Sequence, residues 1–374
     1  MTVTLADVAA RAGVSAATVS RVLNGNYPVA GDTRTRVLRA VEELEYVVNG
    51  PASSLAAATS DLIGILVNDI ADPFFGVLAS AVQSQISPLG SGRVQKLAVI
   101  CNTGGSPERE LTYLTLLQRQ RAAAVVLTGG AVEDPAHTRA LAARLRRLEA
   151  AGARVILCGR PPLALPDTLP DPSAGTDGTG GTADEGGEPG TIGRCTLTFD
   201  NRGGARRLTE HLLSLGHRTV GYLAGPAART TTRHRLEGHR AALAAAGLGA
   251  DRERLTVHGA FTRSSGYEGA QELLRREPGL TAVLAANDTV ALGATAALRE
   301  QGLRIPEDIS VTGFDDLPFA ADAAPALTTV RIPLHEAGVR AGRLAMGLET
   351  PPEGGPATVP ADLMIRASTA PPRP

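Results

Sequence analysis

The sequence predicts a small all-α domain at the N-terminus, followed by a larger α/β core built on parallel sheets. Near the N-terminus, two short helical patterns flank a glycine, and from residue 61 onward short apolar runs alternate with amphipathic stretches. The chain has 374 residues, of which 43% are hydrophobic and 20% charged. This length and composition are typical of a globular protein with more than one domain.

A pair of short helices is predicted close to the N-terminus. Thr4 with Asp7 three residues later has the form of a capping box, so we expect a helix from Leu5. Gly13 ends that helix, and Ser15 caps the next one. Two helices joined by such a turn form a helix-turn-helix. The apolar residues expected to face each other are Val8, Ala9, Ala12, Val19, Val22 and Leu23.

The outer face of the second helix is suited to DNA. Ala16, Ala17 and Ser20 keep this face thin enough to enter a major groove about 12 Å wide. Arg21 can donate two hydrogen bonds to the O6/N7 edge of guanine. A third helix from Thr33 would close the core. Because helix-turn-helix geometry also occurs without DNA, a plain helical bundle remains the alternative reading, and the net charge of −1 requires any nucleic-acid contact to be local.

The N-terminal residues also carry a family resemblance. "TLADVAARAGVSAATVSRVLNG" followed by "TRTRVLRAVEELEYVVN" resembles, nearly position for position, the headpiece of the LacI/GalR family of bacterial repressors. The resemblance implies that Ala16, Ala17 and Arg21 read bases and that their polar neighbours contact phosphates or cap helices. The full set expected to contact DNA is Thr4, Ser15, Ala16, Ala17, Thr18, Ser20, Arg21, Asn24 and Leu55.

A connector at residues 49–60 is expected to separate the headpiece, residues 1–48, from the core. After Asn49 it reads "GPASSLAAATS", where Pro51 can begin a helix that has too little apolar surface to fold alone. The resemblance implies a hinge helix that inserts Leu55 into the minor groove and kinks the duplex. The family has an arginine where this chain has Ser53. A plain interdomain linker is the alternative.

The core, residues 61–374, contains apolar runs such as LIGILV, AAVVLTG and TAVLAAND, which predict buried parallel strands with crossover helices. Residues 163–192 interrupt this rhythm with Gly, Pro and acidic residues and no basic one, so we expect a disordered, exposed insertion. The GTGG in this insertion is a poor nucleotide fingerprint, because no strand precedes it and no helix follows.

The core also resembles the rest of the same family, whose fold is shared with periplasmic sugar-binding proteins. The resemblance implies two doubly wound parallel-sheet lobes, joined by three crossovers around a ligand cleft. We expect the first lobe to comprise about residues 61–162 and 290–323. The second lobe is expected to comprise about residues 191–289 and 324–370.

Ligands of parallel sheets bind beyond the carboxyl ends of the strands, so the loops there are candidate sites. Phe74 and Phe75 follow a predicted strand and could stack on a sugar or a base, although one could equally be core. The family has asparagine where this chain has Asp72, and an acid where it has Gly159. The effector-binding set implied is Asp72, Phe74, Phe75, Arg160, Arg235, Phe261 and Asp288. For Arg235 and Asp288, a helix-start charge is the alternative.

The sequence therefore predicts a transcriptional regulator, a repressor, whose operator affinity is controlled by a small-molecule effector such as a sugar. We expect a cytoplasmic homodimer on pseudo-palindromic double-stranded DNA, with no cofactor, no metal and no membrane partner. A stand-alone sugar-binding protein is the alternative, but it would need an export signal and no helix-turn-helix. An enzyme is disfavoured because the histidines lack metal spacing and an evident catalytic partner.

Overall fold

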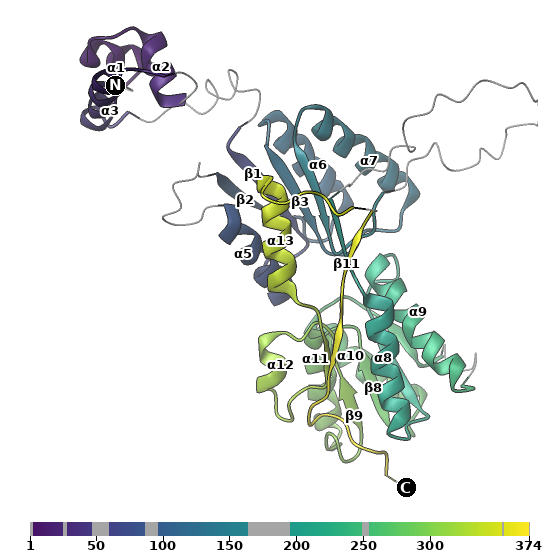
Figure 1. Ribbon diagram of the computed structural model, residues 1–374. Helices are drawn as coiled ribbons and strands as arrows, with labels where there is room; N and C mark the ends of the chain where they lie inside the picture. Colours follow the sequence, from purple (N-terminus) through teal and green to yellow (C-terminus); the bar gives the residue numbers. More distant parts are fainter. Residues whose placement is uncertain are drawn as a thin grey trace, which may run out of the picture. The chain divides into compact units, whose positions relative to one another are not determined.

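The structure is a computed structural model that describes residues 3–24, 28–46, 60–86, 96–163, 195–248, 254–353 and 355–373. The chain divides into two compact units, Met1–Ser60 and Asp61–Pro374. Each unit has hydrophobic clusters of its own. Figure 1 shows the first unit as a bundle of short helices and the second as sheets covered by helices.

The N-terminal unit is the predicted helix-turn-helix with a third helix. The Thr4 side chain and the Asp7 side chain each accept from the other's backbone N–H, and Gly13 ends the first helix in the left-handed conformation at φ 65°. These features confirm both predicted ends. The third helix begins two residues before the predicted Thr33, and no side chain caps it. The helices are α1 (Leu5–Ala12), α2 (Ala16–Asn24) and α3 (Gly31–Glu43).

The first lobe of the core is built on a six-stranded parallel sheet in the order β11-β5-β4-β3-β1-β2. Its central strands are almost wholly apolar and buried, as expected for a sheet covered on both faces. The strands are β1 (Leu62–Val67), β2 (Leu97–Asn102), β3 (Ala124–Thr128), β4 (Arg154–Cys158), β5 (Cys195–Phe199) and β11 (Ala357–Val359). The helices are α5 (Pro73–Ile86), α6 (Pro107–Arg119), α7 (Pro135–Ala150) and α13 (Leu334–Met346).

The second lobe has a four-stranded parallel sheet in the order β7-β6-β8-β9 and a small antiparallel pair, β10 with β12. The strands are β6 (Val220–Ala224), β7 (Thr256–His258), β8 (Ala282–Ala285), β9 (Ser310–Thr312), β10 (Thr329–Arg331) and β12 (Asp362–Met364). The helices are α8 (Asn201–Ser214), α9 (Thr230–Ala245), α10 (Arg263–Arg276), α11 (Asp288–Glu300) and α12 (Pro318–Asp322).

The lobe boundaries differ from the predicted ones. Residues 290–323 lie in the second lobe, because β9 pairs with β8 and the apolar face of α11 packs in the same cluster. Part of 324–370 lies in the first lobe, because α13 packs on α5 and β11 pairs with β5. The chain thus crosses between the lobes three times, after β5, after β10 and between β11 and β12. Partners distant in sequence decide these assignments, so local patterns did not reveal them.

Helix α13 packs closely on α5, and two glycines make this approach possible (Figure 1). A Cβ on Gly338 would lie 2.6 Å from the Cβ of Ala81 and 2.7 Å from the backbone oxygen of Leu78. A Cβ on Gly342 would similarly lie 2.7 Å from the backbone oxygen of Val82. The two helices are therefore in near-backbone contact, and the crossover that ends in α13 is fixed against α5.

Substitution of Gly338 by alanine should lower the free energy of unfolding by about 1 to 3 kcal/mol, because the new methyl group has no space in this contact. Gly76→Ala is the matched control in α5, where the nearest atom to a new Cβ is 3.9 Å away. There the better helix propensity of alanine should leave stability unchanged or raise it. Urea unfolding measures both, and equal midpoints for Gly338→Ala and the parent would contradict the close packing.

Candidate functional site

A cavity of about 430 Å³ lies between the two lobes of the core. Its walls come from the residues that follow β1, β3, β4, β5, β6 and β8, the carboxyl ends at which parallel sheets bind ligands. Its volume falls within the range of small-molecule sites, ~300 to 1,000 Å³. The polar lining residues are Asn68, Asp69, Asp72, Asn201, Arg229, Thr231, Arg235, Thr262, Asn287 and Asp315.

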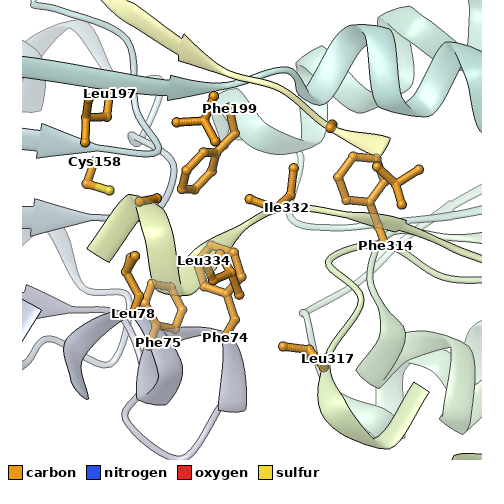
Figure 2. Packing of buried hydrophobic residues seen from close by; sticks show 14 of the residues in the cluster. Phe74, Phe75, Leu78, Cys158, Leu197, Phe199, Phe314, Leu317, Ile332 and Leu334 are labelled. Carbon is orange, nitrogen blue, oxygen red and sulfur yellow. The ribbon is translucent and has the colours of Figure 1, made fainter. Parts of the chain in front are cut away.

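The apolar walls of the cavity are phenylalanine rings, and three of them lie directly over a glycine at a strand end. A Cβ on Gly129 or Gly159 would come within 2.8 Å of the ring above it, and both glycines have a left-handed φ, 74° and 87°. Figure 2 shows Phe74 and Phe75 beside Leu334, with Phe199 above them. The pairs are Phe75 on Gly129, Phe199 on Gly159 and Phe261 on Gly225.

The centre of the polar wall is the ion pair of Arg235 with Asp315. The Nη2 of Arg235 lies 2.8 Å from the carboxylate, and each side chain is only 4% exposed. Arg235 also donates from Nε to the side-chain oxygen of Asn201 at 2.8 Å and from Nη1 to the backbone oxygen of Ala286. Its guanidinium lies 3.7 Å over the ring of Phe314. Three of its five N–H groups are thus used within the protein, and Arg235 also lines the cavity.

Asp315 reaches the cavity through an unusual backbone. Its φ is 102° and that of Asp316 is 56°, a left-handed pair that costs about 1 to 3 kcal/mol per residue. The crossover strand holds this conformation, since the Asp315 N–H donates to the oxygen of Val330 at 2.7 Å. Asp316 in turn accepts from Arg331 at 2.7 Å. The position of the carboxylate in the cavity therefore depends on β10.

Asp69 and Asp72 form a second acidic group on the first-lobe side. Each accepts one backbone N–H, from Ala71 and Phe74 respectively, both at 3.0 Å. Among the residues the structure describes, no cation forms an ion pair with either carboxylate. Burial, with smaller contributions from Asp315 and Asp69, raises the pKa of Asp72 to about 6. This side of the cavity is therefore negatively charged.

Hydrogen bonds and an ion pair also join the two lobes beside the cavity. The Thr230 N–H donates to the oxygen of Ala131 at 3.0 Å, and the Ala131 N–H donates to the Thr230 hydroxyl at 3.0 Å. Arg233 forms an ion pair with Glu133 at 2.6 Å, and Arg229 bonds the oxygen of Gly130 at 3.3 Å. These contacts link the loop after β3 to the start of α9.

In the N-terminal unit, the residues predicted to contact DNA gather on α2 and its start. Ser15, Ala16, Ala17 and Arg21 are exposed, whereas Thr18 and Ser20 are half-buried. The Thr4 hydroxyl accepts the backbone N–H of Asp7 at 3.4 Å, which makes Thr4 the N-cap of α1. The remaining predicted contacts, the side chain of Asn24 and Leu55, lie outside the described residues.

Family models match both units of the chain. Residues 4–49 match the model described as bacterial regulatory proteins, lacI family, and residues 209–369 match a periplasmic binding protein-like domain. The transcriptional regulator GalS of Salmonella typhimurium is 36% identical over 92% of this chain and 89% of its own length. The regulator CelR of Thermobifida fusca is 33% identical over 97% and 95%. The chain belongs to the LacI family.

Solved structures of LacI-family proteins agree over nearly the whole chain. A complex of CelR with cellobiose has a TM-score of 0.64 at 32% identity and covers 98% of this chain and 99% of its own. A lac repressor dimer bound to operator and the anti-inducer ONPF has a TM-score of 0.74 at 28% identity, over 99% and 100%. This LacI-family chain is thus a DNA-binding transcriptional regulator under effector control rather than an enzyme. In the described residues, no helix is long and apolar enough to span a membrane.

Arg160, one of the predicted effector ligands, does not line the cavity of this LacI-family core. It is 2% exposed and donates to Glu110 at 2.8 Å and to the backbone oxygens of Gly129 and Thr128. Burial alone would raise the pKa of Glu110, but Arg160 and His137 lower it to about 2. Arg160 therefore holds the loop after β3 in place, and Gly159 and Phe199 line the cavity instead.

Asp288 is the second predicted effector ligand that the structure places elsewhere. It is fully buried, and its carboxylate accepts from the backbone N–H of Leu317 at 2.7 Å and from the Thr329 hydroxyl at 2.6 Å. Its neighbour Asn287 lines the cavity instead and caps α11 through the N–H of Val290 at 2.9 Å. Asp288 thus joins α11, α12 and the crossover strand.

Five predicted effector residues do line the cavity, and several lining residues were not predicted. The predicted ones are Asp72, Phe74, Phe75, Arg235 and Phe261. Some of the others could have been found from their place in the sequence, because Asn287 and Asp315 each follow a buried strand, as does Asn68. Asn201 likewise follows β5, whereas Phe199 lies within that strand and Arg229 precedes α9, so neither of these two carries this signal. The missed residues that matter most are Asn287, Asp315, Asn201, Phe199 and Arg229.

Replacement of Asp288 by alanine should lower the free energy of unfolding by about 2 to 4 kcal/mol, because it leaves two buried donors without an acceptor. Asp322→Ala is the control, since Asp322 is exposed on α12. Guanidinium unfolding of both variants measures the effect. A normal midpoint for Asp288→Ala combined with lost effector binding would instead make Asp288 a ligand contact.

Proposed function

We propose that this LacI-family regulator is a repressor that binds a pseudo-palindromic operator as a homodimer, in the cytoplasm. We further propose that a saccharide bound between the core lobes changes its affinity for that operator. The observation that carries this proposal is the cavity itself, whose aromatic and hydrogen-bonding walls come from both lobes, in a chain that begins with a helix-turn-helix.

The DNA contacts proposed are those of α2 and the connector. Arg21 reads a guanine, Ala16 and Ala17 make room at the base edges, and Leu55 enters the minor groove. The exposure of Arg21 and of both alanines supports this assignment. Ser15 contributes a cap or a phosphate contact, since its hydroxyl already accepts the Thr18 N–H at 3.2 Å.

A saccharide matches the chemistry of the cavity. Phenyl rings such as Phe75 and Phe261 can lie against the C–H faces of a sugar ring, while Asn287 and Arg235 can bond its hydroxyl groups. Relatives support the class, because the solved CelR complex contains cellobiose and a LacI-family regulator from Enterococcus faecium contains ribose.

The coupling from cavity to the rest of the core runs through the crossover after β10. Arg235 holds Asp315, and Asp315 bonds the oxygen of Val330 and, through its own oxygen, the N–H of Ile332 at 3.4 Å. This crossover leads directly into α13, which packs on α5. The start of α5 lines the cavity through Phe74. A ligand that changes the angle between the lobes therefore acts on a single connected element.

The dimer proposal is supported by the edge of the first-lobe sheet. Strand β2 ends the sheet, and its Leu97 and Ile100 are 64% and 39% exposed. Exposed apolar side chains on an edge strand favour association unless another surface covers them. The lac repressor structure at a TM-score of 0.74 is a dimer on its operator.

Substitution of Arg21 by alanine should weaken specific operator binding by at least tenfold, because a bidentate guanine contact contributes about 1 to 3 kcal/mol and a dimer loses two. Arg146→Ala, an exposed arginine on α7, is the matched control. Fluorescence anisotropy with a genomic operator fragment at fixed salt measures both. Equal affinity of Arg21→Ala and the parent would remove Arg21 from the base-reading set.

Substitution of Arg235 by lysine should raise the saccharide concentration needed for half-maximal change in operator binding at least tenfold. Lysine keeps the charge beside Asp315 but lacks the planar fork that bonds several acceptors at once. The saccharide used is the one that most raises the melting temperature in a panel of mono- and disaccharides. A parental response curve would place the effector outside this cavity, whereas Arg146→Ala should respond as the parent does.

A further inference from the structure

The charges of the cavity are unevenly distributed between its two sides. On the second-lobe side, the charges of Arg235 and Asp315 compensate each other at 2.8 Å. Arg229, another lining residue, donates to the backbone oxygens of Gly105 at 2.7 Å and of Gly130. On the first-lobe side, Asp69 and Asp72 accept only backbone N–H groups among the described residues. Within the described part of the chain, no cation forms an ion pair with either of these two carboxylates.

The environment of Asp72 reflects this imbalance. Of the charged neighbours that act on its carboxylate, Asp315 and Asp69 disfavour its ionised form, and Arg235 contributes the smallest opposing effect. Burial disfavours the ionised form further and raises the pKa of Asp72 to about 6. A ligand cation placed here would relieve this repulsion. A ligand anion would add to it in a partly desolvated site.

The surroundings of Asp72 also fit a particular shape of ligand. Its carboxylate lies at the start of α5, one turn from the ring of Phe75, and Phe74 lies edge-on to Phe75 with the ring centroids 5.0 Å apart. Aromatic faces accept the C–H surface of a sugar ring and attract a nearby cation. A carboxylate accepts hydrogen bonds only, whereas an asparagine amide would also donate. Hydroxyl groups alone would not require this charge.

We propose that the effector is an amino saccharide, whose ammonium group forms an ion pair with Asp72 beside Asp69 while its ring stacks on the phenylalanine wall. This inference rests on the proposed function, since it assumes that the cavity is the effector site. It names the class of effector that the lining residues select, and it predicts that phosphorylated and acidic sugars are rejected.

The test measures binding by the full chain at pH 7 with isothermal titration calorimetry. The probes are matched sets in the gluco, galacto and manno series: the neutral hexose, its 2-amino derivative, the N-acetylated amine and the uronic acid. A second set consists of cellobiose, its diamino counterpart and cellobiouronic acid. The N-acetylated sugars keep the substituent but remove its charge. We expect one amine to bind about tenfold more tightly than its neutral and N-acetylated counterparts.

Two variants assign that preference to the carboxylate. Asp72→Asn keeps an oxygen that accepts the Phe74 N–H. This variant should bind the amine and its neutral counterpart with affinities within twofold of each other. Asp69→Asn should reduce the preference for the amine only in part. Asp322→Asn, an exposed aspartate on α12, should keep the full preference. The inference is overturned if no amine binds more tightly than its neutral counterpart, if an acid binds best, or if Asp72→Asn retains the preference.

Operator binding by the same preparations separates this inference from the proposed function. If the chain binds operator and responds to a neutral or acidic sugar, only the inference that the effector is an amino saccharide is wrong. If it binds no operator, or if Arg235→Lys responds as the parent does, the proposed function itself fails.

Discussion

The buried ion pair of Arg235 with Asp315 is the interaction on which the rest of the core depends. Two charges that are each 4% exposed carry a large desolvation cost, and it is offset only because the guanidinium also bonds Asn201 and Ala286 and stacks on Phe314. Removal of one partner would leave an uncompensated charge. The pair therefore fixes α8, α9 and the loops after β8 and β9 in a single arrangement.

Hydrogen bonds and ion pairs around Asp315 and Asp316 explain why a strained backbone persists beside this pair. Asp315 and Asp316 are held at left-handed φ values by bonds on both sides, to Val330 of the crossover strand and to Arg331 and Arg366. Because these bonds belong to the crossover, the carboxylate in the cavity and the path of the chain between lobes are set together. A ligand that contacts Asp315 thus acts on the same residues that join the lobes.

The sequence predicted best what is decided locally. The ends of α1 and the start of α2 follow from Thr4, Gly13 and Ser15, whose caps lie within a few residues of one another. The prediction from sequence failed where the role of a residue depends on which way its side chain points. Asp288 and Asn287 are neighbours at one helix start, yet only Asn287 faces the cavity, because Leu317 and Thr329 of distant elements take the carboxylate.

Helix α5 connects the two roles of the core. Its first turn presents Phe74 and Phe75 to the cavity, and its later turns lie against the glycines of α13, which leave no slack between the helices. A close-packed contact of this kind transmits a displacement, since it cannot be compressed and has few alternative side-chain positions. A displacement of the α5 backbone at the phenylalanine wall would therefore be passed to α13, and with it to the crossover that positions Asp315 in the same cavity.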